Sequence, residues 1–74
     1  MPKLDARTVA EHRRQVLDRL YRSFEALIYE RGYDAINLAD IAQMSDMART
    51  AIYHYYPDKE ALLLAYTAHE MDEY

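Results

Sequence analysis

The sequence of 74 residues contains no cysteine, which excludes a disulfide framework and a thiolate metal site. No apolar run approaches the roughly 20 residues that a membrane-spanning helix requires. The N-terminal segment also lacks the apolar stretch of a signal peptide. From these absences we expect a cytoplasmic protein without a membrane partner, held together by a small hydrophobic core rather than by covalent links.

Positive charge is also scarce, because the formal net charge is −4 at pH 7. The imbalance is uneven along the chain. Residues 1–31 hold seven basic and five acidic side chains, residues 32–59 hold two and four, and residues 60–74 hold four acidic side chains and no basic one. If the chain binds a polyanion, the acidic last segment is expected to point away from it, and phosphate affinity per domain should be modest.

Glycine occurs once, and its place marks the end of a long first helix. Thr8 and Glu11 match a capping box, which predicts a helix start near Val9. Gly32 stands where a left-handed residue would end that helix. Between these two signals the apolar residues recur at helical spacing and predict one buried stripe: Val16, Leu20, Phe24, Leu27 and Ile28.

Two short helices follow with a four-residue break. Asn37 is a good cap for a helix over Leu38–Met44, and Asp40 is favourable in its first turn. Residues 45–48 form the turn, which makes the flanking helices cross steeply. The inward residues of this part are expected to be Ile41, Ala42, Ile52 and Tyr56.

A third helix is expected from Ala48 or Arg49 to Tyr55 or Tyr56, where Pro57 stops it. It is crowded with side chains that reach DNA, and a short helix placed after such a turn can enter a major groove. Asp58 then caps a fourth helix, whose buried side is expected to comprise Leu62, Leu63 and Tyr66. The fold predicted from these signals is all-α, with a helix-turn-helix that reads double-stranded DNA.

These residues resemble the N-terminal domain of the tetracycline-repressor-like (TetR) family of bacterial transcription regulators, over about residues 14–66. The specific part of the resemblance is a combination of three motifs in order. They are Ile41-Ala42, then Tyr53-His54 with an aromatic residue two places on, and then Lys59 before a leucine run. The positions in matching register are Gly32, Tyr33, Asn37, Leu38, Ile41, Ala42, Met47, Ile52, Tyr53, His54, Tyr56, Lys59 and Leu62.

The sequence departs from the family pattern at four places. Asp46 replaces the turn glycine, and aspartate tolerates left-handed backbone better than most residues. Ala48 replaces the serine that starts the third helix, so that cap is missing, and Asp46 capping one turn earlier is an alternative. Asn37 stands for the usual threonine and Ile28 for the usual phenylalanine.

The resemblance implies a homeodomain-like three-helix domain at residues 8–60, a flexible arm at 1–7, and the start of a connecting helix at 58–74. Family members are about three times this length. Their remaining helices form an effector pocket and a dimer interface, which implies that this chain is a fragment. The implied partners are a palindromic operator, a second copy in the full-length protein, and a small-molecule effector. The fragment itself is expected to be monomeric, with no cofactor.

The expected DNA-binding residues share the third helix and its flanks. Arg49 suits a guanine contact, with phosphate as the alternative, and Lys59 resembles the family's phosphate-binding lysine. The full set is Asn37, Arg49, Thr50, Ala51, Tyr53, His54, Tyr55 and Lys59. Basic residues at the N-terminal end are interpreted as surface, with flanking-phosphate contact as the alternative: Lys3, Arg7, Arg13 and Arg14.

Catalysis is not expected. His69 and Asp72 share a helix face, but two ligands do not make a metal site, and the sequence has no glycine-rich loop or acid–base pair. The function predicted is therefore sequence-specific DNA binding within a ligand-responsive regulator, most simply a repressor. The rival is a helical protein-interaction module that keeps the fold without binding DNA, and the acidic helix-turn-helix segment supports it.

Overall fold

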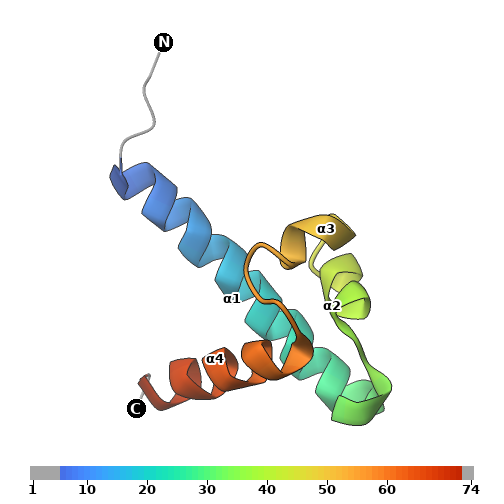
Figure 1. Ribbon diagram of the computed structural model, residues 1–74. Coiled ribbons are helices and arrows are strands. Elements are labelled where there is room, and N and C mark those ends of the chain that lie inside the picture. The colour runs from blue at the N-terminus through green and yellow to red at the C-terminus, as the bar shows by residue number, and fades with distance from the viewer. Residues whose placement is uncertain (1–5, 73–74) are drawn as a thin grey trace.

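The computed structural model describes residues 6–72, with side chains over 8–71, and this part of the chain is helical without a strand (Figure 1). The predicted all-α class is confirmed. The elements in chain order are α1 (Ala6–Arg31), a short 3₁₀ helix η1 (Tyr33–Ala35), α2 (Leu38–Met44), α3 (Arg49–Ile52) and α4 (Lys59–Asp72).

The first helix is longer than the sequence predicted. It begins at Ala6, so residues 6 and 7 belong to the helix rather than to an arm. Thr8 and Glu11 consequently lie inside α1, and the predicted helix start at Val9 is wrong. The arm assignment for residues 1–5 falls outside the described residues. A capping box is a local signal, and the helical propensity of Ala6 and Arg7 favours one further turn.

The end of α1 lies at Gly32, as predicted. The Gly32 amide donates to the Ile28 carbonyl at 2.8 Å, and its backbone has φ 85° and ψ 155°. This φ is positive, but the ψ value lies outside the left-handed helical region, in a region that is essentially restricted to glycine. The chain therefore reverses into η1 with a backbone that other residues would adopt only under strain.

The core forms where α1 is crossed by the other helices. Four side chains of the predicted α1 stripe are buried, and Ile28 packs against them half-buried. Ile41 and Ala42 of α2, Ile52 of α3 and Leu62 of α4 meet this stripe. The buried apolar side chains are Val16, Leu20, Phe24, Leu27, Ile36, Leu38, Ile41, Ala42, Ile52 and Leu62.

The second helix matches its predicted bounds because its start is fixed by local hydrogen bonds. Asn37 Oδ1 accepts from the Asp40 amide at 2.9 Å, and Asp40 Oδ2 accepts from the Asn37 amide at 3.0 Å. This reciprocal pair is a capping box. A buried bond from Ser45 Oγ to Ser23 Oγ, at 2.9 Å, fixes the other end of α2 against α1.

The turn after α2 places Asp46 at φ 58°, the left-handed conformation in which the family has glycine. The Asp46 amide donates to the Gln43 carbonyl at 3.2 Å, whereas its carboxylate has no hydrogen-bond partner within residues 8–71. Ala48, at the N-cap of α3, supplies no side-chain cap. The alternative in which Asp46 caps the next helix is thus not the arrangement observed.

We expect Asp46→Gly to be neutral or stabilising in thermal unfolding, because glycine adopts positive φ without the cost that a side chain carries. Asp46→Ala serves as the control and should lose about 1 kcal/mol, since alanine tolerates this backbone poorly. A loss above about 1 kcal/mol for the glycine variant would instead show that the carboxylate caps α3 in solution.

The third helix is shorter than predicted. Its α-helical part is only Arg49–Ile52, and Tyr53–Tyr55 continue as a tighter turn. The His54 and Tyr55 amides donate to carbonyls three residues back, at 3.1 and 3.0 Å. Pro57 disfavours helical geometry at Tyr56, so the segment does not continue as a helix beyond this turn. We refer to residues 48–56 as the recognition segment.

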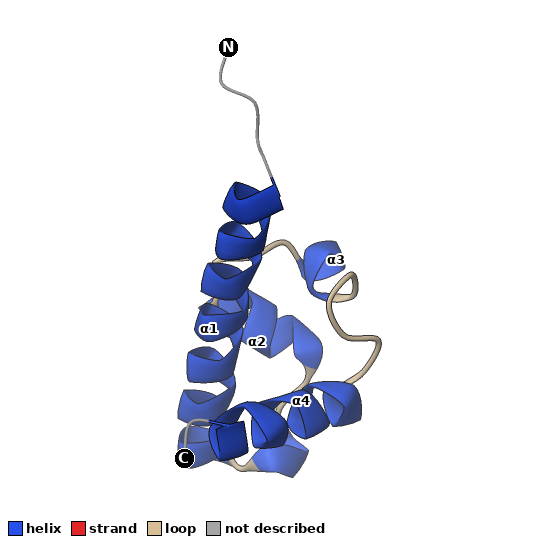
Figure 2. Cartoon of the chain, turned by 90° about the vertical axis from the view of Figure 1, so that its left-hand side faces the viewer, coloured by secondary structure: helices blue, strands red, loops and turns tan. Residues whose placement is uncertain are grey.

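The last helix begins after Asp58, whose Oδ1 accepts from the Ala61 amide at 2.8 Å, so the predicted cap is confirmed. Figures 1 and 2 show α4 crossing the second half of α1, while α3 lies nearer the first half. A hydrogen bond of 2.8 Å between the hydroxyls of Tyr21 and Tyr56 fixes the end of the recognition segment on α1. Tyr56 is half-buried, a less complete burial than the sequence suggested.

Candidate nucleic-acid interface

The recognition segment is held by one apolar anchor and exposes polar side chains around it. Ile52 is fully buried, whereas Arg49, Thr50, Tyr53 and His54 are exposed. Tyr53 is 51% exposed, so about half of its surface is covered by the fold. This arrangement presents a guanidinium, two hydroxyls and an imidazole on a short rigid segment that contains no carboxylate.

Three of the other predicted residues flank this surface. Ala51 and Tyr55 are half-buried, between the exposed side chains and α1. Asn37 is exposed, but its Oδ1 already caps α2, which leaves its amide N–H group as the donor available to a phosphate. Contact of these residues with DNA stays a prediction.

A contact that the sequence did not reveal joins α1 to the recognition segment. The Arg13 guanidinium carbon lies 5.4 Å from the centre of the Tyr55 ring, within cation–π range. Because Arg13 and Tyr55 are far apart in the sequence, no local pattern could signal this pair. The stacking restrains Tyr55 and places a second arginine beside the recognition segment.

Lys59 is the second unexpected feature, because its ammonium group bonds within the fold. Nζ donates to the Tyr33 carbonyl at 2.7 Å and to the Ile36 carbonyl at 2.9 Å. It also lies 4.1 Å from the centre of the Tyr33 ring. Two of its three donors therefore tie the first turn of α4 to the loop after α1, and one remains for a phosphate.

We expect Lys59→Met to lower the free energy of unfolding by about 1–3 kcal/mol, because two partly buried carbonyls lose a charged donor. If the third donor also reaches DNA, the salt slope of binding should fall by about 0.9 per half-site. Thermal unfolding and DNA titration measure the two effects separately. Unchanged unfolding would contradict the role in the fold, and an unchanged slope would remove Lys59 from the interface.

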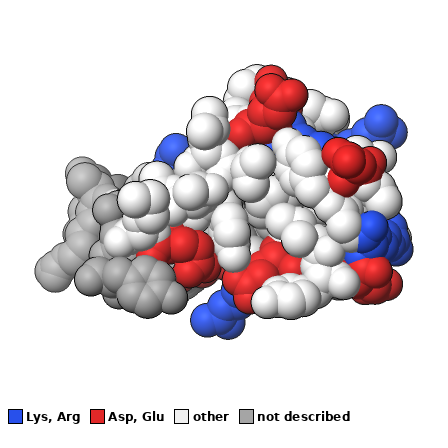
Figure 3. Space-filling model, turned by 90° about the horizontal axis from the view of Figure 1, so that it is seen from below, with Lys and Arg blue, Asp and Glu red and all other residues white. Residues whose placement is uncertain are grey.

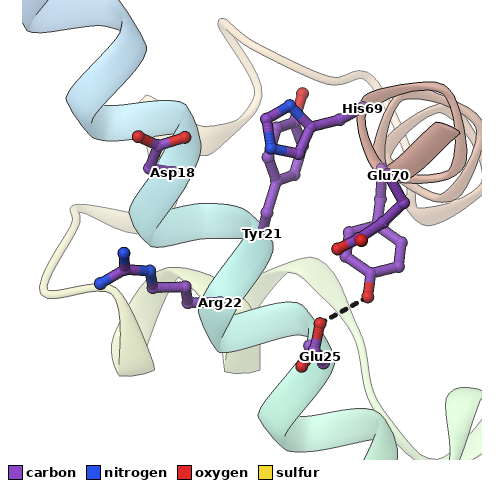
Figure 4. A pocket seen from close by; sticks show the side chains of 7 residues that line it. Asp18, Tyr21, Arg22, Glu25, His69 and Glu70 are labelled. Atoms are coloured by element: carbon purple, nitrogen blue, oxygen red, sulfur yellow. Dashed lines mark hydrogen bonds between the residues drawn. The ribbon is translucent and has the colours of Figure 1, made fainter. Parts of the chain in front are cut away.

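A different polar cluster lies between α1 and α4 (Figure 4). Tyr66 donates to Glu25 Oε2 at 2.6 Å, and the rings of Tyr21 and His69 stack at 4.7 Å. The hydrogen bond to Glu25, followed by burial, raises the pKa of Tyr66, so the phenol stays protonated at neutral pH. Within the described residues no group of histidine and carboxylate side chains is arranged to hold a metal ion.

The charge on the lower face does not favour a polyanion. Figure 3 shows the side opposite the first turns of α1, where carboxylates and cations are interspersed among uncharged side chains. No continuous basic patch is visible on the described part of this face. The carboxylate-free recognition segment is the better candidate for contact with phosphate and base edges.

Two short helices, α2 and α3, are joined by a tight turn and packed on the long helix α1. Polar side chains are exposed on α3. This arrangement defines a helix-turn-helix domain of the DNA-binding type. The sequence model of the family described as "Bacterial regulatory proteins, tetR family" matches residues 20–66. The chain therefore belongs to the tetR family, and its class is that of DNA-binding transcription regulators.

Three curated relatives are similar to this chain over most of its length, and two of them are named transcriptional repressors. The HTH-type transcriptional repressor Rv1474c of Mycobacterium tuberculosis is 40% identical over 65 residues, which are 88% of this chain and 33% of that protein. The nucleoid occlusion factor SlmA of Haemophilus influenzae is 34% identical over 68 residues, 92% and 30% of the two chains. The HTH-type transcriptional repressor KstR of Rhodococcus jostii is 30% identical over 69 residues, 93% and 31% of the two chains.

The chain spans about a third of the length of these relatives. No solved structure matches it. Among the described helices, none combines the length and the apolar character needed to cross a lipid bilayer.

Proposed function

We propose that this chain is the operator-reading part of a ligand-responsive transcriptional repressor, and that the recognition segment enters the major groove of double-stranded DNA. The observation that carries the proposal is the recognition segment itself. Ile52 is fully buried in the core, so the backbone of α3 is held firmly while Arg49, Thr50 and His54 stay exposed. Side chains on a fixed backbone can read base edges because their geometry is set before binding.

The individual roles follow from side-chain chemistry. Arg49 donates two hydrogen bonds to guanine O6 and N7, and the methyl groups of Thr50 and Ala51 meet thymine. Tyr53, His54 and Tyr55 position the domain through phosphate contacts, which fix register without reading sequence. Asn37 adds a phosphate contact from the start of α2, and Lys59 adds one through its remaining donor.

The complete regulator is proposed to act as a homodimer on a palindromic operator, in the cytoplasm, with an effector bound outside residues 1–74. Support comes from the two relatives that are named repressors and from the family to which the chain belongs. A two-fold dimer would place two recognition segments in successive major grooves, about 34–36 Å apart.

Binding to duplex DNA across a range of salt concentrations tests the proposal against its rival, a protein-interaction module that keeps the fold. A DNA reader that neutralises Z phosphates loses affinity with a log–log slope of about −0.9Z. We expect steep weakening with rising salt and a preference for one duplex in a pool of random sequences. Absence of binding even at low salt would favour the rival, whose support is the excess of carboxylates over cations in residues 32–59.

A further inference from the structure

An open cleft separates the first half of α1 from the recognition segment. It is lined by Val9, His12 and Arg13 on one side and by Ala51, His54 and Tyr55 on the other. Figures 1 and 2 both place the first half of α1 and α3 toward the same end of the molecule. The cleft therefore borders the surface that carries Arg49 and Thr50.

The ionisable side chains of this cleft suit an anion, and they stand beside the apolar side chains of Val9 and Ala51. It holds one guanidinium and two imidazoles, and none of its described lining residues is a carboxylate. His12 and His54 are both exposed. Glu11 precedes His12 but, at about 100° further round the helix, does not line the cleft. This is a concentration of potential positive charge in a protein whose net charge is −4.

Arg13 is oriented for a further contact. Its guanidinium carbon lies over the Tyr55 ring, with 5.4 Å between Cζ and the ring centre. Within the described residues no hydrogen bond or ion pair engages the Arg13 N–H groups, so they can donate to a ligand in the cleft. Oxygens of a phosphodiester accept such a fork of donors well, and pre-orientation by Tyr55 reduces the entropy lost on binding.

We propose that this cleft binds one backbone phosphate of the DNA at the edge of the recognition segment, through Arg13, His12 and His54. The inference rests on the proposed DNA-binding function and adds to it a second contact surface contributed by α1. It also implies a dependence on pH. Protonated imidazole attracts phosphate more strongly than neutral imidazole, so affinity should rise as the pH falls.

The charged groups near His12 and His54 determine whether the pH dependence of DNA affinity can be assigned to these two histidines. From α1 they are Arg13 in the cleft and Glu11 beside it in sequence, and from the recognition segment they are Arg49 and the phenol of Tyr55. Arginine and tyrosine keep their charge state between about pH 6 and pH 8. The remaining titratable groups in the cleft are its two histidines, and the third histidine of the chain, His69, lies in the separate cluster between α1 and α4.

The test is the affinity of the 74-residue chain for a labelled duplex about two helical turns long, measured by anisotropy against salt. Arg13→Gln should weaken binding about three- to tenfold and reduce the salt slope by about 0.9. Arg14→Gln is the matched control, since it removes the same charge from an exposed residue outside the cleft. Arg13→Lys should restore the slope, which a purely structural role in stacking on Tyr55 would not predict.

The pH arm uses the same duplex. The wild-type chain should bind about three- to tenfold more tightly near pH 6 than near pH 8. The double variant His12→Gln, His54→Gln should lose that difference, while His69→Gln keeps it. Two results would overturn the cleft assignment. One is that the wild type binds DNA but Arg13→Gln and Arg14→Gln weaken binding equally. The other is that the double variant keeps the pH dependence of the wild type. Failure of the wild type to bind any duplex would instead refute the proposed function.

Discussion

Fusing residues 1–74 to an external dimerisation module is expected to raise apparent affinity for a palindromic operator by about 10²–10⁴-fold. The chain presents one recognition segment, with Arg49 as its single cation, so one copy should bind weakly. Once one half of a dimer is bound, the second half samples its half-site at a high effective concentration. The gain comes from the linkage and requires no new contact with DNA.

Two controls separate this effect from a change in the domain. A fusion carrying Arg49→Ala in both halves should keep its dimeric state and lose the gain on the specific site. A linker too short to place the segments about 34–36 Å apart should also lose it. Sedimentation should show the unfused chain to be mainly monomeric. A stable dimer of the unfused chain, or a fusion that binds no better than the single domain, would contradict the proposed assembly.

Replacing Arg49 with alanine is expected to cost about 1–3 kcal/mol on the specific site, and to relax preference at one base position. The guanidinium is exposed on α3 and has no ion-pair partner within the described residues, so its removal should leave stability nearly unchanged. The measurement compares affinities for the specific duplex and for duplexes substituted at each position.

Arg22→Ala is the control for Arg49→Ala because it removes the same charge from the cluster between α1 and α4, away from α3. It should change affinity for all duplexes only slightly. If Arg49→Ala weakens specific and random DNA equally, Arg49 contacts phosphate and does not read a base. If it weakens neither, the recognition segment assigned here is not in the groove.

The parts of the fold that the sequence predicted correctly are those fixed by local bonds. Asn37 and Asp40 are three residues apart, so a cap box between them can be recognised from sequence, and α2 has the predicted bounds. The apolar stripe of α1 was predictable for a similar reason, because helical spacing determines which side chains share a face. Asp46 at positive φ followed from the turn position that the resemblance gave it.

The wrong predictions concern helix ends whose positions are set by distant or competing interactions. The start of α1 depends on whether one more helical turn forms at Ala6, which a cap signal at Thr8 does not determine. The early end of α3 comes with His54 and Tyr55 amides that bond three residues back rather than four, which no local signal in the sequence indicated.

For the candidate site, the sequence predicted which segment carries it and which types of side chain it presents, but not the contacts between distant residues. Exposure of His54 follows from its place two residues after the buried Ile52, on the opposite face of a helical turn. The bonds of Lys59 to carbonyls more than 20 residues away required the path of the chain around α1. The stacking of Arg13 on Tyr55 likewise exists only because two helices cross, so no spacing rule within one element could indicate it.

The most direct test of the central claim is an amide chemical-shift titration of the isotope-labelled chain with duplex DNA. The largest changes are expected at Arg49–Tyr55 and at Asn37, with smaller ones near His12 and Arg13. The amides around His69 and Glu70, in the cluster of Figure 4, should change little. Changes concentrated in that cluster, with Arg49–Tyr55 unaffected at saturation, would contradict the assignment of the recognition segment as the surface that reads DNA.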